Sequence, residues 1–88
     1  SLMDNFWKRV QAVKELYPNA LITLGNKSYD ENHNEVTLNE TDIANKITEQ
    51  DTTRANEATA KTNLKASAKA KLIAGEALTE DEANTIVL

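Results

Sequence analysis

The chain of 88 residues contains no cysteine and few aromatic side chains. Without cysteine it can form neither a disulfide framework nor a thiolate metal site. The aromatic residues make up 5% of the sequence and all lie in its first third, at Phe6, Trp7, Tyr17 and Tyr29. Because bulky side chains supply most of the area that a small domain buries, we expect the N-terminal part to nucleate the core.

Long apolar runs are missing as well. No stretch approaches the roughly 18 apolar residues of a membrane span, and the start lacks the basic region and apolar segment of a secretory signal. We therefore expect a soluble intracellular protein without membrane contact. Ser1 and Leu2 precede Met3, so we expect the natural start at Met3 and take residues 1–2 as a cloning remnant.

Basic residues are outnumbered by acidic ones, and the net charge of −4 disfavours a general nucleic-acid binder. The charge is arranged in blocks. Residues 39–51 are mainly acidic, residues 54–71 mainly basic, and the segment from Glu76 onward carries acids and no base. These blocks could set the orientation of contacts between helices or between chains.

The N-terminal segment has the periodicity of an amphipathic helix from Met3 to Tyr17. Asp4 is the expected N-cap, and Pro18 should end the helix because it cannot continue the hydrogen-bond ladder. Phe6 and Trp7 are adjacent on this helix, and we expect them mainly in the core. Trp7 lies at the edge of the apolar stripe, where it could also anchor an interface.

A short apolar run from Ala20 to Leu24, closed by Gly25-Asn26, predicts a small buried strand. A strand needs a partner, and the best candidate is residues 35–38, where apolar and polar side chains alternate. Residues 27–29 are the alternative, as an extension of the first strand or as its partner. The N-terminal unit is thus expected to be a helix packed on a strand pair.

The rest of the sequence predicts a helical tail. Asn39 and Asp42 have the spacing of a capping box at the start of a long helix, and Gly75 has the position of its C-cap. A second capping box, residues 79–82, predicts a final short helix that runs through Leu88. Between Thr48 and Lys71 the only large apolar residue is Leu64.

The apolar residues of the long helix do not share one face. At about 100° per residue, Lys61 and Lys65 fall on the face of Ile43 and Ile47, whereas a second stripe of Leu64, Ala68 and Leu72 is displaced to one side. Either the middle of the helix is solvated, or the helix breaks near residues 51–53. The expected fold class is α+β and mainly helical: an N-terminal helix, a short β-hairpin, a long helix that is continuous or broken, and a short C-terminal helix. Residues 3–38 would form the helix and hairpin unit and residues 39–88 the tail of a single small domain.

Residues 30–35 are the densest group of potential ligands, and they include the lone histidine, His33. Their spacing is similar to the start of a calcium loop, but Glu35 stands where glycine makes the turn and Thr41 where the bidentate acid belongs. We therefore favour a solvated polar loop over a cation site. His33 has no cysteine, second histidine or activated nucleophile to work with. We expect no catalytic residue, no cofactor, no metal site and no enzymatic activity.

Two sets of side chains are candidates for partner contacts. The apolar candidates are Phe6, Trp7, Ile43, Ile47, Leu64 and Leu72, and the basic candidates are Lys61, Lys65 and Lys69, one helical turn apart. For the lysines we favour a solvated face, or a face docked within the chain on the acidic block from Glu76 to Glu82, over a binding site for a partner. Nucleic-acid binding is less favoured because no aromatic residue is interleaved with these bases.

The segment Val13-Lys14-Glu15-Leu16-Tyr17-Pro18-Asn19-Ala20, followed by a short strand and by Thr41-Asp42-Ile43 at a helix start, resembles small tail-associated or virion accessory proteins of double-stranded DNA bacteriophages. The resemblance implies a non-enzymatic phage protein that contacts other phage structural proteins, in the host cytoplasm or the virion. Our leading hypothesis is a structural or assembly protein that self-associates as a homo-oligomer. The alternative is a small regulator that binds nucleic acid or a host protein through the Lys61 to Lys71 face.

Overall fold

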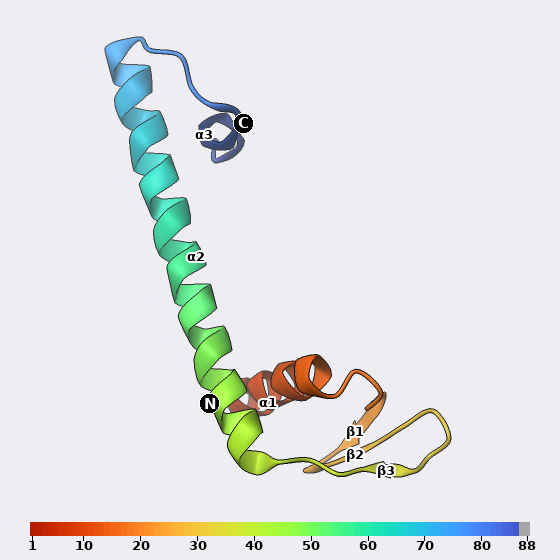
Figure 1. The fold of residues 1–88 in the computed structure, drawn as a ribbon. Helices are drawn as coiled ribbons and strands as arrows, with labels where there is room; N and C mark the ends of the chain where they lie inside the picture. Colours follow the sequence, from red (N-terminus) through yellow and green to blue (C-terminus); the bar gives the residue numbers. More distant parts are fainter. Residues whose placement is uncertain (87–88) are drawn as a thin grey trace. The chain divides into compact units, whose positions relative to one another are not determined.

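The computed structural model describes residues 1–86 and confirms the α+β, mainly helical fold class. It separates into two compact units, Ser1–Asp51 and Thr52–Leu88, with the division inside the longest helix. Figure 1 shows the elements in chain order: α1 (Leu2–Leu16), β1 (Ile22–Leu24), β2 (Lys27–Tyr29), β3 (Glu35–Val36), α2 (Glu40–Ala74) and α3 (Glu80–Asn84).

Helix α1 begins at Leu2, and its N-cap is Ser1 rather than the predicted Asp4. The Ser1 hydroxyl accepts a hydrogen bond from the Asp4 amide at 3.3 Å, and the Asp4 carboxylate accepts one from the Ser1 hydroxyl at 2.9 Å. The prediction was wrong because Asp4 is the third helical residue of a capping box, where an acid supports the cap rather than forming it. The helix ends at Leu16, two residues before Pro18.

The three strands form one antiparallel sheet in the order β1-β2-β3. A two-residue turn joins β1 to β2, and its first residue, Gly25, has a φ of 64°, as a type II′ turn requires. The expected pairing of residues 20–24 with residues 35–38 is therefore wrong, and the alternative partner, residues 27–29, is the observed one. Strand β3 is only two residues long and pairs with the other side of β2.

The core of the first unit lies between the second half of α1, the end of the α1–β1 loop and the start of α2. Its buried members are Ala12, Val13, Ala20 and Ile43, and the partly buried residues packed against them are Leu16, Tyr17, Val36, Leu38 and Ile47. The expectation that residues 20–24 form a buried strand is wrong: the strand is Ile22–Leu24, and although Ala20 is buried, Leu21 and Leu24 are 63% and 67% exposed. As an edge strand, β1 is flanked by a neighbour on one side only.

Polar side chains tie α1 to the first turns of α2. Arg9 pairs with Glu40 at 2.7 Å, and Lys46 pairs with Glu15 at 3.2 Å. Gln50 donates a 2.6 Å hydrogen bond to the same Glu15 carboxylate. Hydrogen bonds from Gln50 and Lys46 lower the pKa of Glu15, and the hydrogen bond from Arg9 lowers the pKa of Glu40.

Helix α2 is continuous from Glu40 to Ala74, so the predicted alternative of a break near residues 51–53 is not what the structure contains. Asn39 caps it, as predicted, because its side-chain oxygen accepts a 2.9 Å hydrogen bond from the Asp42 amide. Every residue from Ala55 to Asn63 is exposed, so the middle of the helix is solvated on all sides. Alanine, which has the highest helix propensity, occupies three of these nine positions and favours the helix there.

The C-terminal end of α2 has the predicted glycine cap. Gly75 has a φ of 69°, its amide donates to the Leu72 carbonyl, and the Glu76 amide donates to the Lys71 carbonyl. These two bonds form a Schellman motif. Helix α3 begins at the predicted Thr79 cap but ends at Asn84, whereas the sequence predicted a helix through Leu88. Val87 and Leu88 lie outside the described residues.

Candidate interaction surfaces

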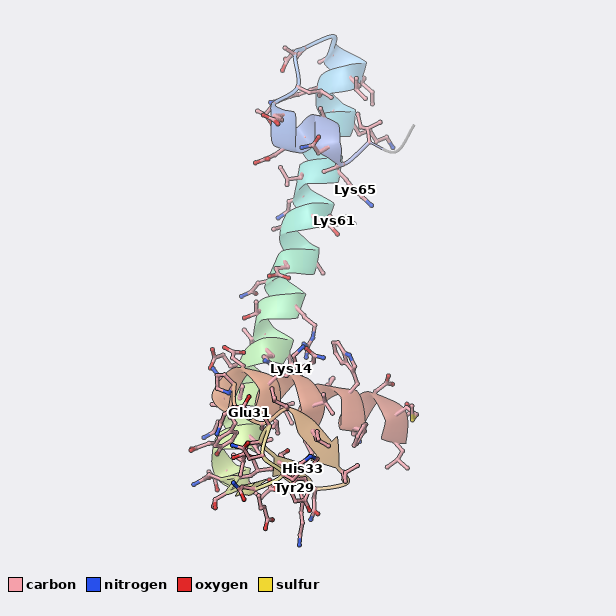
Figure 2. The ribbon with its side chains drawn as sticks, turned by 90° about the vertical axis from the view of Figure 1, so that its right-hand side faces the viewer. Lys14, Tyr29, Glu31, His33, Lys61 and Lys65 are labelled. Carbon is pink, nitrogen blue, oxygen red and sulfur yellow. The ribbon has the colours of Figure 1, made fainter. Side chains whose placement is uncertain are left out.

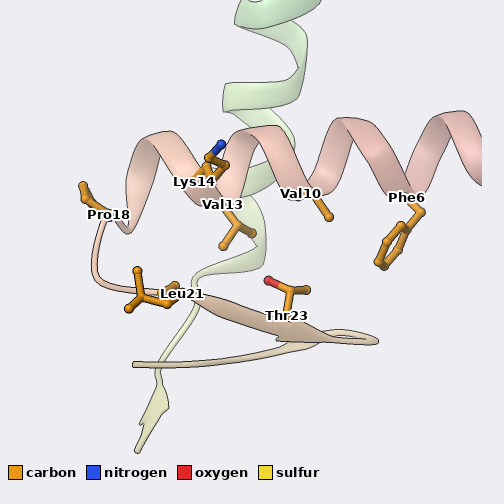
Figure 3. A pocket seen from close by; sticks show the side chains of 8 residues that line it. Phe6, Val10, Val13, Lys14, Pro18, Leu21 and Thr23 are labelled. Atoms are coloured by element: carbon orange, nitrogen blue, oxygen red, sulfur yellow. The ribbon is translucent and has the colours of Figure 1, made fainter. Parts of the chain in front are cut away.

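An open groove lies between α1 and β1 in the first unit. It has a volume of about 710 Å³ and a mainly apolar lining. Figure 3 shows Phe6, Val10 and Val13 pointing from α1 toward the strand, and Thr23 pointing back toward the helix. The lining is completed by Lys14, Pro18, Ala20 and Leu21. Such a concave, largely apolar surface is the usual form of a site that takes another apolar group.

Buried side chains and hydrogen bonds hold the two sides of the groove in place. Val13 is 1% exposed and Ser28 is fully buried, and the hydroxyls of Thr23 and Ser28 are hydrogen-bonded at 3.1 Å. Arg9 holds the β1–β2 turn to α1, since its guanidinium donates a 3.2 Å hydrogen bond to the Asn26 carbonyl. The groove is therefore largely preformed in the single chain.

The aromatic pair on α1 is not part of the core. Phe6 and Trp7 are 45% and 49% exposed, so the expectation that both lie mainly in the core is wrong for the single chain. The physical reason is that α1 buries its second half, around Ala12 and Val13, against the core. Phe6 consequently forms part of the wall at one end of the groove.

A second apolar surface covers the opposite face of the same strand. Ile22 and Leu24 are 39% and 67% exposed and line a shallow pocket of about 380 Å³ together with Tyr29 and His33. Strand β1 thus presents two exposed apolar side chains on this face, whereas on the groove face its side chain is Thr23 and the exposed Leu21 precedes the strand. Sequence reasoning named none of the exposed β1 residues as interaction candidates, because the short apolar run was taken for a buried strand.

The predicted apolar candidates on α2 have different surroundings. Ile43 is 2% exposed and Ile47 packs against the same core, so these two hold the first unit together. Leu64 is half-buried, whereas Leu72 is 57% exposed. The neighbouring Ile73, which the stripe analysis did not include, is 79% exposed.

The basic candidates Lys61, Lys65 and Lys69 are exposed, and within residues 1–86 they form no ion pair. Figure 2 labels Lys61 and Lys65, which follow one another along α2. Of the acidic block in the terminal segment, Glu82 pairs instead with Lys71, whose ammonium lies 2.6 Å from its carboxylate. The lysine row is therefore a solvated face in the single chain.

Glu82 is the most enclosed charged group that the structure describes, with 3% of its surface exposed. Its carboxylate accepts hydrogen bonds from Lys71, from the Ser67 hydroxyl and from the Thr79 amide. The bond from Lys71, followed by those from Ser67 and Thr79, lowers the pKa of Glu82 to about 2. This carboxylate fastens α3 to the last turns of α2, which is a structural role.

The polar loop between β2 and β3 is organised by Asp30. One of its carboxylate oxygens accepts hydrogen bonds of 2.9 Å from the amides of Asn32 and Asn34, and His33 has a φ of 65°. In the described part of the chain, no three His, Cys, Asp or Glu side chains are grouped as metal ligands. Backbone amides of the loop itself thus bind one of the two carboxylate oxygens of Asp30.

None of the helices in residues 1–86 is long and apolar enough to cross a membrane. Comparison with protein-family models, with curated proteins and with solved structures found no match to this chain.

Proposed function

We propose that this chain is a non-enzymatic structural or assembly protein that acts through protein–protein contacts and self-association. The observation that carries the proposal is the α1/β1 groove, with exposed Phe6 at one end and exposed Leu21 on its strand side. Burying apolar surface is the main driving force of association, so a preformed apolar groove favours an apolar partner.

The exposed apolar residues of the first unit are grouped rather than scattered. Phe6, Trp7, Leu21 and Leu24 belong to only two elements and the loop that joins them. Single exposed apolar residues are normal on protein surfaces, whereas apolar residues that line one groove, as Phe6 and Leu21 do, favour an interaction site. The phage setting of the proposal rests on the sequence resemblance to virion accessory proteins.

Light scattering coupled to size-exclusion chromatography tests self-association through the groove. We expect the average mass of the wild-type chain to rise with concentration, and Phe6→Glu to shift the protein toward the monomer because it places a charge in the groove wall. Met3→Glu is the matched control, since Met3 is 75% exposed on the same helix and outside the groove. A wild-type chain that stays monomeric at millimolar concentration contradicts self-association.

A second candidate function is binding of nucleic acid through the lysine row. It is supported by the exposure of Lys61, Lys65 and Lys69 and by the absence of ion pairs at these residues within the described chain. Binding of this kind weakens steeply with salt, because phosphate contacts release counterions. Fluorescence anisotropy with labelled DNA and RNA at increasing salt, on the wild type and on K61E/K65E/K69E, tests it. No binding at low salt removes this candidate.

A further inference from the structure

We propose that two copies of this chain pair through the free edges of their β1 strands, antiparallel and centred on Thr23, to form one continuous six-stranded sheet. The inference rests on the proposed self-association and names its surface and its register. It is carried by the chemistry of the β1 edge, by the hydrogen-bond pattern of the hairpin and by the placement of the exposed apolar side chains.

The two edges of the sheet differ in their protection. The β3 edge has two residues, one of which is the exposed Glu35, and charge and short length both discourage pairing with another strand. The β1 edge has no such protection, because no residue from Ala20 to Asn26 is charged. An unprotected apolar edge is a template for a further strand.

The backbone of Thr23 is the natural centre of the pairing. In a hairpin with a two-residue turn, the closing pair, here Leu24 and Lys27, exchanges both backbone hydrogen bonds, and the next pair, Thr23 and Ser28, exchanges none. The N–H and C=O groups of Thr23 are consequently directed toward the free edge. Two Thr23 residues placed opposite one another across a two-fold axis can exchange both bonds.

The side chains fit the same register. With Thr23 opposite its counterpart, Ile22 of one copy lies directly opposite Leu24 of the other, and the same pair repeats across the axis. Both residues are on the face of the sheet that lines the shallow pocket with Tyr29. Cross-strand pairs of large apolar residues are favourable and are buried at the centre of the seam.

The neutral, self-complementary edge favours a second copy over a foreign strand. Residues 20–26 carry no charge, so a charged foreign peptide finds no side chain of opposite charge to pair with. A second copy of the chain, whose edge is equally uncharged, meets no repulsion between like charges there. A stable interface buries about 800 Å² on each partner, more than three strand residues supply. The groove side must therefore contribute, and Leu21 and Phe6 adjoin the strand there with 63% and 45% of their surfaces exposed.

A charge-pair experiment tests the register. I22K and L24E each place one charge in an apolar seam, and we expect each to raise the dimer dissociation constant at least about tenfold in sedimentation equilibrium. In the double variant I22K/L24E, every new lysine lies opposite a new glutamate of the other copy, so association should recover well above either single variant. If the double variant associates no more tightly than the single variants, the antiparallel register is overturned.

A proline tests the edge itself. Thr23→Pro removes the amide that faces the free edge, a position where an edge strand tolerates proline, whereas Thr23→Val removes only the hydroxyl and is the matched control. We expect Thr23→Pro to abolish dimerisation and Thr23→Val to retain it. Amide exchange of Thr23 in the wild type, measured at low and high protein concentration, gives a readout that does not depend on a variant folding, and protection should rise with concentration.

The outcomes separate this inference from the proposed function. A wild type that dimerises, loses the dimer with Phe6→Glu and keeps it with Thr23→Pro supports self-association and overturns edge pairing. If the wild type is monomeric and the exchange of its Thr23 amide does not depend on protein concentration, both self-association and edge pairing are overturned. A strand from another protein would then be the remaining partner for the β1 edge.

Discussion

A single carboxylate, Glu82, governs how the second unit is assembled. It receives the Lys71 ammonium, the Ser67 hydroxyl and the Thr79 amide while almost fully enclosed. These bonds favour the charged form and lower its pKa to about 2. A group whose folded pKa is lowered contributes stability above its unfolded pKa of about 4.5, and this stability is lost as the pH falls through about 2.

We therefore predict that the amides of residues 79–85 lose exchange protection between pH 4.5 and 2. Glu82→Gln should lower that protection at neutral pH and remove most of its pH dependence, because the amide side chain carries no charge to pair with Lys71. Glu80→Gln is the matched control, since Glu80 lies exposed in the same helix. NMR-detected exchange measures both, and identical profiles for wild type and Glu82→Gln would argue against the role assigned to Glu82.

The bounds of the helices are set by the hydrogen bonds that cap their ends. Sequence signals located these ends well where a cap is a local hydrogen bond, as at Asn39, Gly75 and Thr79. They failed at Asp4, because residues 1–2 were set aside as a cloning remnant, although Ser1 and Asp4 have the spacing of a capping box. The strand pairing was likewise ambiguous, since residues 27–29 and residues 35–38 both had strand-forming composition.

At the scale of elements, we predict that Gly75→Ala destabilises the turn between α2 and α3. An alanine at a φ of 69° costs about 1 to 2 kcal/mol, and no neighbouring atom lies within 4 Å of the added Cβ, so the effect is conformational rather than steric. Gly75→Asn should cost less, because asparagine tolerates the left-handed region. Amide exchange at Gly75 and Glu76 measures the difference, and equal protection in wild type and Gly75→Ala would contradict this account.

The whole molecule consists of two units with separate buried residues. Val13 and Ile43 are buried in the first, and Ala68 and Glu82 in the second. Between their buried residues, α2 has nine consecutive exposed positions, Ala55 to Asn63, which carry no tertiary packing. Cooperativity depends on such packing, so the two units should open separately.

We predict that Ile43→Ala destabilises the first unit by about 2 to 5 kcal/mol, the usual cost of emptying a buried isoleucine site. Amides of the first unit, such as Ser28, should lose protection, while the Glu82 amide keeps it. Ile73→Ala is the control, because Ile73 is 79% exposed and its loss leaves no cavity. A uniform loss of protection across both units would show that they unfold as one.

The sequence alone determined the α+β class, the capped ends of the long helix and the lack of any cysteine-based site, because these follow from composition and from hydrogen bonds between near neighbours. It also placed Ile43 and Ile47 on one apolar face of the long helix, and the structure packs that face into the core of the first unit. Only the tertiary structure decided that β1 is an exposed edge, that Phe6 and Trp7 stay half-exposed and that Glu82 binds Lys71. Burial and pairing depend on which distant residues cover a side chain, and a periodic pattern shows which face is apolar without showing what covers it.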